Sequence, residues 1–102
     1  TLANQLVAAG QYSFDLTELY TRKFRKALFE QKNAFSKSNF YQTLFTQLHD
    51  EMNAESARVS KITELGKNEA LLSIEHQQVL AAIALLSDYC MTCTPPKKKK
   101  AL

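Results

Sequence analysis

Two cysteines, Cys90 and Cys93, are the residues of this chain whose types and spacing most readily suggest chemistry. A redox-active CxxC pair lies at a helix N-terminus, where the helix dipole lowers the pKa of the thiol. Here the pair follows a long apolar helical pattern and is expected at a helix C-terminus, where the dipole has the opposite effect. We therefore expect Cys90 to act as a small hydrophobic residue that continues the stripe of the last helix.

A zinc site is the second chemistry that this pair suggests, because zinc needs four ligands and one CxxC supplies two. His76 lies about 21 Å away along the same helix, at 1.5 Å per residue, and is out of reach within one chain. The alternative is a parallel dimer that pools Cys90 and Cys93 from both copies in a four-thiolate site. Apart from that alternative, we predict no metal and no cofactor.

The remaining polar residues do not form a catalytic pattern. His76 falls within the apolar sector of the last helix and is expected in a core or an interface, whereas His49 lies beside two acidic residues and is expected in solvent. Glu51 and Glu55 are four residues apart and share a helix face as a like-charge pair. The chain has no glycine-rich phosphate loop and no HExxH motif. We predict that it is not an enzyme.

A basic face surrounds one aromatic residue. At 100° per residue, Phe29 falls in the helix sector that also holds the cations Arg22, Arg25, Lys26 and Lys32. Three interpretations are open. In the first, Phe29 packs against the short first helix while the cations are solvated. In the second, Phe29 and the cations contact an acidic protein partner. In the third, the ring stacks on a base of a single-stranded nucleic acid.

The chain ends in TPPKKKKAL, in which the two prolines stop the last helix. The segment PPKKKK resembles a monopartite nuclear localisation signal, with Lys97, Lys98, Lys99 and Lys100 as the lysine cluster. TPPK resembles the acceptor site of proline-directed kinases, with Thr94 as the hydroxyl, and a phosphate there would weaken recognition of the lysines. The alternatives are an anchor to an anionic membrane, with the nearby cysteines acylated, or a solubilising tail.

Helices must position all of these residues, because glycine occurs only at positions 10 and 66 and proline only at 95 and 96. We predict an all-α fold with a short helix ending at Gly10, a helix over 15–35, a connection at 36–39, a helix from residue 40 onward and a last helix over about 68–92. If Gly66 is a turn, the chain forms a three- or four-helix bundle with long antiparallel helices. If it is not, a helix of about 50 residues dimerises as a coiled coil.

The last helix is the most apolar element. Leu72, Val79, Ile83 and Leu86 share one sector, and leaving this broad face in water would cost several kcal/mol at roughly 25 cal/mol per Å². The helix is therefore either central in the bundle or part of an oligomer interface. We predict that residues 1–93 form a helical oligomerisation domain and that 94–102 form a disordered basic tail.

Charge and length narrow the function classes. Without the four tail lysines, nine basic side chains stand against ten acidic ones, so the body of the chain is not built to follow phosphates. The longest apolar run, VLAAIALL, is too short to span a bilayer. Two cysteines are too few for a disulfide scaffold, which favours a reducing, intracellular compartment. The chain begins with Thr1, which indicates a fragment or a processed form.

These observations predict a non-enzymatic dimerisation or scaffolding module of a larger nuclear assembly, regulatory or chromatin-associated. Its principal contact would be the apolar sector of the last helix, and its second contact Phe29 with Arg22, Arg25 and Lys26. The partner would be a protein, either a second copy or another chain. The alternative is a module that binds nucleic acid or an anionic membrane through the lysine tail and the Phe29 face.

Overall fold

Three α-helices and one short 3₁₀ turn make up the described part of the chain. The computed structural model describes residues 2–30 and 39–93, and within these ranges the helices are α1 (Leu2–Glu30), α2 (Phe40–Ile62) and α3 (Glu69–Leu85). The 3₁₀ turn η2 (Ser87–Tyr89) follows α3. No strand occurs in the described ranges, and the prediction of an all-α fold is confirmed.

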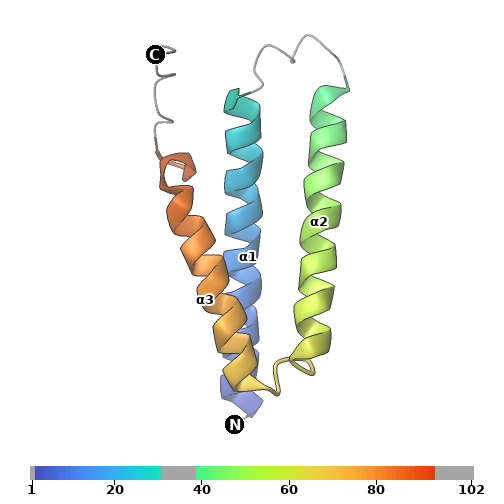
Figure 1. Ribbon diagram of the computed structural model, residues 1–102, viewed down its shortest axis with the longest axis vertical. Coiled ribbons are helices and arrows are strands. Elements are labelled where there is room, and N and C mark those ends of the chain that lie inside the picture. The colour runs from blue at the N-terminus through green and yellow to red at the C-terminus, as the bar shows by residue number, and fades with distance from the viewer. Residues whose placement is uncertain (1, 31–38, 94–102) are drawn as a thin grey trace.

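The helices run antiparallel in sequence order, and α1 is the central one (Figure 1). Both α2 and α3 pack on α1, whereas they make few contacts with each other. In Figure 1, α1 (blue) accordingly stands between α3 (orange) and α2 (green), and α3 crosses α1 at an angle. The bundle therefore has three helices, at the lower end of the predicted range.

The core lies where the three helices meet. Tyr12, Leu16 and Leu19 of α1 are buried at helical spacing, and so are Val59 of α2 and two residues of α3, Leu72 and Val79. Positions 12, 16 and 19 recur every three or four residues and so lie on one side of α1. This side of α1 faces the other two helices. The opposite side is exposed from Ala3 to Thr17, whereas residues 20–29 are all half-buried.

Gly10 does not end a helix. The predicted short first helix and the helix from residue 15 are one continuous helix, α1, so the predicted boundary at Gly10 is wrong. An interior glycine weakens a helix by about 1 kcal/mol relative to alanine, but it does not break the hydrogen-bond ladder. Nothing in the described structure lies within 4 Å of the position that a side chain at Gly10 would take.

Gly66 is a turn. It has φ +89°, and it follows Glu64 and Leu65 with φ 54° and 61°, so three successive residues have left-handed backbones. The turn is held by Thr63, whose hydroxyl donates to the Val59 carbonyl at 2.6 Å and accepts from Gly66 N–H at 3.2 Å. Asn68 caps α3 by accepting from Leu71 N–H at 3.1 Å. This turn excludes the single helix of about 50 residues.

The last helix is shorter than predicted. It ends at Leu85 rather than near residue 92, and the chain continues through η2 into a further turn, in which Cys93 N–H donates to the Cys90 carbonyl at 3.1 Å. Carbonyls at the end of a helix have no partner within the helix. At this end of α3 the Ile83 and Leu86 carbonyls accept hydrogen bonds from the N–H groups of Leu86 and Tyr89 and in addition accept hydrogen bonds from Arg22 of α1.

Candidate interaction surface

The apolar sector of α3 faces α1 of the same chain. Leu72 and Val79 are only 4% and 7% exposed, and Ile83 and Leu86 are half-buried against the same core. The apolar sector of α3 is thus buried within the bundle, although the central helix is α1 rather than α3. Leu72 and Val79 therefore hold the bundle together within one chain, while Ile83 and Leu86 keep part of their surface exposed. The role of these four residues as the principal contact with another chain stays a prediction.

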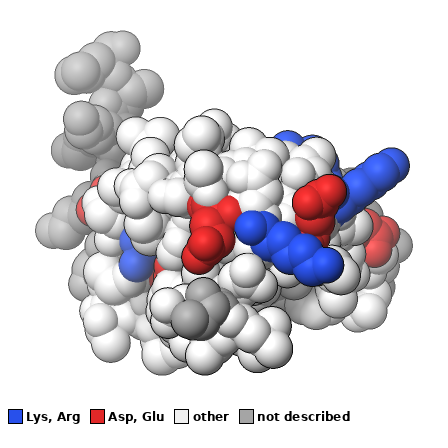
Figure 2. All heavy atoms as spheres, turned by 90° about the horizontal axis from the view of Figure 1, so that it is seen from below, with Lys and Arg blue, Asp and Glu red and all other residues white. Residues whose placement is uncertain are grey.

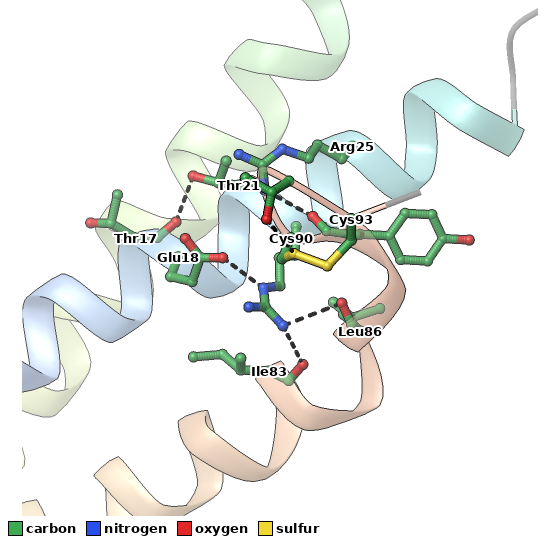
Figure 3. A network of polar contacts seen from close by, with 11 residues as sticks. Thr17, Glu18, Thr21, Arg25, Ile83, Leu86, Cys90 and Cys93 are labelled. Atoms are coloured by element: carbon green, nitrogen blue, oxygen red, sulfur yellow. Dashed lines mark hydrogen bonds and ion pairs between the residues drawn. A yellow bond between two sulfur atoms is a disulfide. The ribbon is translucent and has the colours of Figure 1, made fainter. Parts of the chain in front are cut away.

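Two arginines of the basic face hold the end of α3. Arg22 pairs with Glu18 at 2.6 Å and donates from its other arm to the carbonyls of Ile83 at 3.1 Å and Leu86 at 3.4 Å (Figure 3). Arg25 donates to the Tyr89 carbonyl at 2.8 Å. Cations suit this place because the helix dipole makes the C-terminal end of a helix negative. Both guanidinium groups are thus used within the chain.

Phe29 packs on the segment that follows α3. Its ring meets the ring of Tyr89 edge to face, with centroids 6.2 Å apart, and the side chain is half-buried. There is no separate first helix for it to pack against, so that interpretation is corrected. Lys26 is also half-buried on α1. The contact of this face with a protein partner stays a prediction, and Arg22 and Arg25 already have partners within the chain.

Cys90 and Cys93 are joined by a disulfide in the turn that follows η2 (Figure 3). The turn between them brings their Cα atoms to 5.0 Å, within the range that a disulfide needs. The expectation that Cys90 continues the stripe of the last helix is wrong, because the helix ends five residues earlier. In the disulfide form neither sulfur is a thiolate, so neither is a zinc ligand.

His76 joins α3 to α1. Its Nε2 lies 2.6 Å from Asp15 Oδ2, and both side chains are less than one-fifth exposed. Its ring also meets Tyr12 edge to face at 6.1 Å. A histidine held in the core is what the sequence predicted. His49 is exposed and contacts the Phe45 ring at 5.6 Å.

A polar cluster joins α2 to α3 beside Tyr12. Arg58 of α2 donates to Glu55 of the same helix and, at 2.6 Å, to the buried Glu75 of α3. The Tyr12 hydroxyl is buried next to these charges and has no hydrogen-bond partner among the described residues. Burial raises the pKa of Tyr12 to about 12, and the two carboxylates add to this increase while Arg58 opposes it.

An apolar groove of about 300 Å³ lies between α1 and α2. Its apolar walls are Tyr20, Phe24, Phe45, Leu48 and Met52, and its polar lining is Thr17, Thr21 and His49. The Phe24 and Phe45 rings meet edge to face at 6.1 Å across it, yet Phe45 is 56% exposed.

The large exposed apolar side chains of α1 all lie in its first half. Leu2, Leu6, Val7 and Phe14 are between 65% and 72% exposed. At 100° per residue, Val7 and Phe14 lie opposite the core together with the exposed small residues Ala3, Gly10 and Thr17 and the half-buried Thr21. Leu2 and Leu6 lie between this side and the core. Thr17 and Thr21 also line the groove between α1 and α2. We call these eight residues the open face of α1. A helix boundary at Gly10 would divide this face in two, so the residue pattern on either side of the glycine did not predict it.

Charge is mixed at the end of the bundle where α1 begins. Figure 2 looks onto that end, which also holds the α2–α3 turn, and shows acidic and basic side chains interspersed among uncharged ones. Residues 1–14 contain no charged side chain at all. Neither observation provides the broad basic surface that a phosphate-binding domain needs.

The described ranges lack two features that would suggest other functions. No group of three or more His, Cys, Asp or Glu side chains is placed there to hold a metal ion. No helix there has the length and apolar character needed to cross a membrane. Thr94 and the lysines 97–100 lie outside the described residues, so the phosphorylation site, the nuclear signal and the disordered tail stay predictions.

Comparisons with protein-family models, with curated protein sequences and with solved structures found no match for this chain.

Proposed function

We propose that this chain is a non-enzymatic dimerisation or scaffolding module that associates through the open face of α1. The observation that carries the proposal is the exposure of Leu2, Leu6, Val7 and Phe14 on one helix that has no charged residue before Asp15. Several large apolar side chains left exposed on one helix, in a protein that is otherwise well supplied with charges, mark an interaction site.

The gain from covering this face is large enough to matter. Complete burial of a Leu, Val or Phe side chain is worth roughly 1.5–3 kcal/mol, so four side chains about two-thirds exposed would gain roughly 4–8 kcal/mol. Association costs on the order of 4–15 kcal/mol in lost freedom. One such face alone reaches only the lower part of that range. A symmetric pair of chains buries the face twice, which favours a second copy of this chain as the partner.

Other segments of the same chain are poorly suited to cover this face. Residues 31–38 read QKNAFSKS and residues 94–102 read TPPKKKKAL. Together they hold one Phe and one Leu among lysines, prolines and polar residues. They lack the apolar residues needed to match the four large side chains of α1.

The test is the solution mass of the purified full chain, measured by light scattering over a concentration series. We expect the mass to rise toward twice the 11.6 kDa of one chain. The double variant Val7→Glu/Phe14→Glu should stay at the mass of one chain with unchanged helicity, because the charges cannot be buried unpaired. The matched control Ile74→Glu/Leu85→Glu changes two exposed residues of α3 and should still dimerise. A wild-type chain that stays monomeric at every concentration overturns the proposal.

The wider setting is also proposed: a nuclear assembly, regulatory or chromatin-associated. It rests on the resemblance of PPKKKK to a nuclear localisation signal. In a reducing nucleus the cysteines would be thiols rather than the disulfide of the structure. A fusion of the chain to a fluorescent protein tests this localisation. The fusion should enter nuclei, and replacing all four lysines 97–100 by Ser should keep the fusion out of nuclei. A cytoplasmic wild-type fusion would contradict this assignment.

The alternative function, binding of nucleic acid or an anionic membrane, loses support from the structure. Arg22 and Arg25 donate to carbonyls at the end of α3, and the Phe29 ring packs on Tyr89. The Phe29 face therefore does not display its arginines and its ring together for a phosphate and a base. What remains for this alternative is the lysine tail.

A further inference from the structure

We propose that the element covering the open face of α1 is α1 of a second copy, running antiparallel, with Phe14 of each copy seated over Gly10 of the other. This inference rests on the proposed function and adds the partner helix and its register. It concerns the central row of the open face, which consists of Ala3, Val7, Gly10, Phe14, Thr17 and Thr21.

The spacing of this row fits an antiparallel pair. The steps from one position to the next are four, three, four, three and four residues, so the row keeps to an arc of roughly 80° along α1. This alternation is the heptad spacing at which helices pack side by side. The series is also the same when it is read backwards. An antiparallel copy can therefore meet it position for position.

The sizes of the residues fit the same register. When the twofold axis passes α1 near residue 12, Phe14 of one copy lies opposite Gly10 of the other, Val7 opposite Thr17, and Ala3 opposite Thr21. The levels Phe14–Gly10 and Thr21–Ala3 then combine a larger residue with a smaller one, as well-packed helix contacts do, and the level between them pairs two β-branched residues of similar size. A parallel pair in register would instead place Phe14 against Phe14 and Gly10 against Gly10, leaving a clash beside a void.

Gly10 supplies an independent observation. It lies inside a continuous helix, where glycine is unfavourable, and nothing in the described structure comes within 4 Å of the place where its side chain would be. No turn and no close neighbour within the described chain explains a glycine here. The Phe14 ring of a second copy, packed into this space, does explain the glycine.

The two threonines can be covered without loss. The Thr17 hydroxyl donates to the Ser13 carbonyl at 3.0 Å, and the Thr21 hydroxyl donates to the Thr17 carbonyl at 2.8 Å; Figure 3 shows the second bond. Because both hydroxyl protons are already used within α1, burying these side chains leaves no donor unpaired. The C-terminal half of the row is thus suited to an apolar partner.

The first experiment exchanges the residues at positions 10 and 14, so that the phenylalanine and the glycine change places. Gly10→Phe alone places two rings against each other, and Phe14→Gly alone removes the ring, so each should weaken dimerisation at least 100-fold in analytical ultracentrifugation. The double variant Gly10→Phe/Phe14→Gly restores one ring opposite one glycine and leaves α1 with the same residues. It should dimerise within tenfold of the wild type. A double variant as weak as the single ones, with wild-type helicity, overturns the inference.

A second experiment reads the register in the full chain. The photo-crosslinker benzoylphenylalanine replaces Ala3, and mass spectrometry locates the attachment in the cross-linked dimer. Attachment near Thr21 of the second copy supports the antiparallel register, whereas attachment near residue 3 or on α2 or α3 refutes it. In these last cases the dimer exists and only the register fails. A chain that remains monomeric in the light-scattering series refutes the proposed function as well.

Discussion

Replacing Tyr12 by Phe should make the protein more stable, although Tyr12 is one of its core residues. The Tyr12 side chain is 4% exposed and its hydroxyl has no hydrogen-bond partner among the described residues. Leaving a buried polar group unsatisfied costs about 1–3 kcal/mol. The Phe variant removes that cost, keeps the ring and keeps its edge-to-face contact with His76.

The expected gain at pH 7 is about 1 kcal/mol, at the lower end of this range, because the removed oxygen also loses its packing contacts. For a domain of this size, 1 kcal/mol corresponds to a rise in Tm of about 4–8 °C. The assay is urea and thermal unfolding of both proteins, followed by circular dichroism at a protein concentration where the association state is the same. Tyr41→Phe is the matched control, since Tyr41 is half exposed and little change is expected.

The same substitution should also change the alkaline pH dependence. Burial raises the folded-state pKa of Tyr12 from 10 to about 12. Between pH 10 and pH 12 the unfolded tyrosine loses its proton while the folded one keeps it, so the free energy of unfolding falls as the pH rises. The loss reaches about 3 kcal/mol at 1.36 kcal/mol per pKa unit. Below pH 10 the hydroxyl is neutral in both states and contributes no slope.

The difference between wild type and variant isolates this effect, because Tyr20 and Tyr89, whose pKa values burial also raises, titrate in both proteins. The advantage of the Phe variant should therefore grow from pH 10 to pH 12. If Tyr12→Phe lowers the free energy of unfolding at pH 7 by 1 kcal/mol or more, the hydroxyl has a partner and the reasoning is refuted. An equal slope in both proteins above pH 10 would refute the alkaline part.

Three further changes test other contacts. Gly10→Ala should raise the free energy of unfolding of the monomer by about 1 kcal/mol in chemical denaturation, because nothing surrounds this helical position; a loss would show that the site is crowded. Arg58→Met should lower the free energy of unfolding by about 2 kcal/mol at pH 7, because the buried Glu75 loses its ion pair. The double variant Arg58→Met/Glu75→Leu should recover most of that loss, and equal stability of the two variants would contradict this reasoning. Reducing the Cys90–Cys93 disulfide should lower the free energy of unfolding by no more than about 2 kcal/mol, since the closed loop is only four residues long. A larger fall in calorimetry would mean that the disulfide stabilises contacts outside the turn that it closes.

The helical class could be predicted from the sequence because its cause is local. Glycine and proline are scarce, and the apolar residues recur at helical spacing. The turn at Gly66 could be recognised as one of two alternatives for the same reason. A positive φ suits glycine, and Asn68 is a good helix cap, yet the choice depended on whether α1 lay close enough to receive the turn. That contact is not local, and it lies at Ala9.

The predicted end of α3 was wrong because the residues that determine where this helix ends are distant in the chain. The apolar pattern continues to Cys90, but two arginines more than sixty positions earlier bind the carbonyls at residues 83–89 and hold the turn that replaces the helix. No residue near Leu85 indicates that arginines of α1 will bind these carbonyls. The basic face around Phe29 was recognised as a group, but its use could not be inferred without knowing where α3 ends.

The open face of α1 was within reach of sequence analysis. Val7 and Phe14 lie seven residues apart with Gly10 between them, and the heptad spacing crosses that glycine unchanged. Treating the glycine as a helix end concealed the pattern. Which side of α1 is covered by its own chain still required the structure, because both sides carry apolar residues.

The central position of α1 has a consequence for the synthesis of this protein. Asp15 binds His76, and Arg25 binds Tyr89, 61 and 64 positions later in the chain. At 5–20 residues per second, a ribosome needs roughly 3–13 seconds to make the segment that α1 awaits. During that time Tyr12, Leu16 and Leu19 have no partner from α3. The helix made first is therefore completed last, and a chain that stops before α3 should remain a substrate for chaperones rather than a folded intermediate.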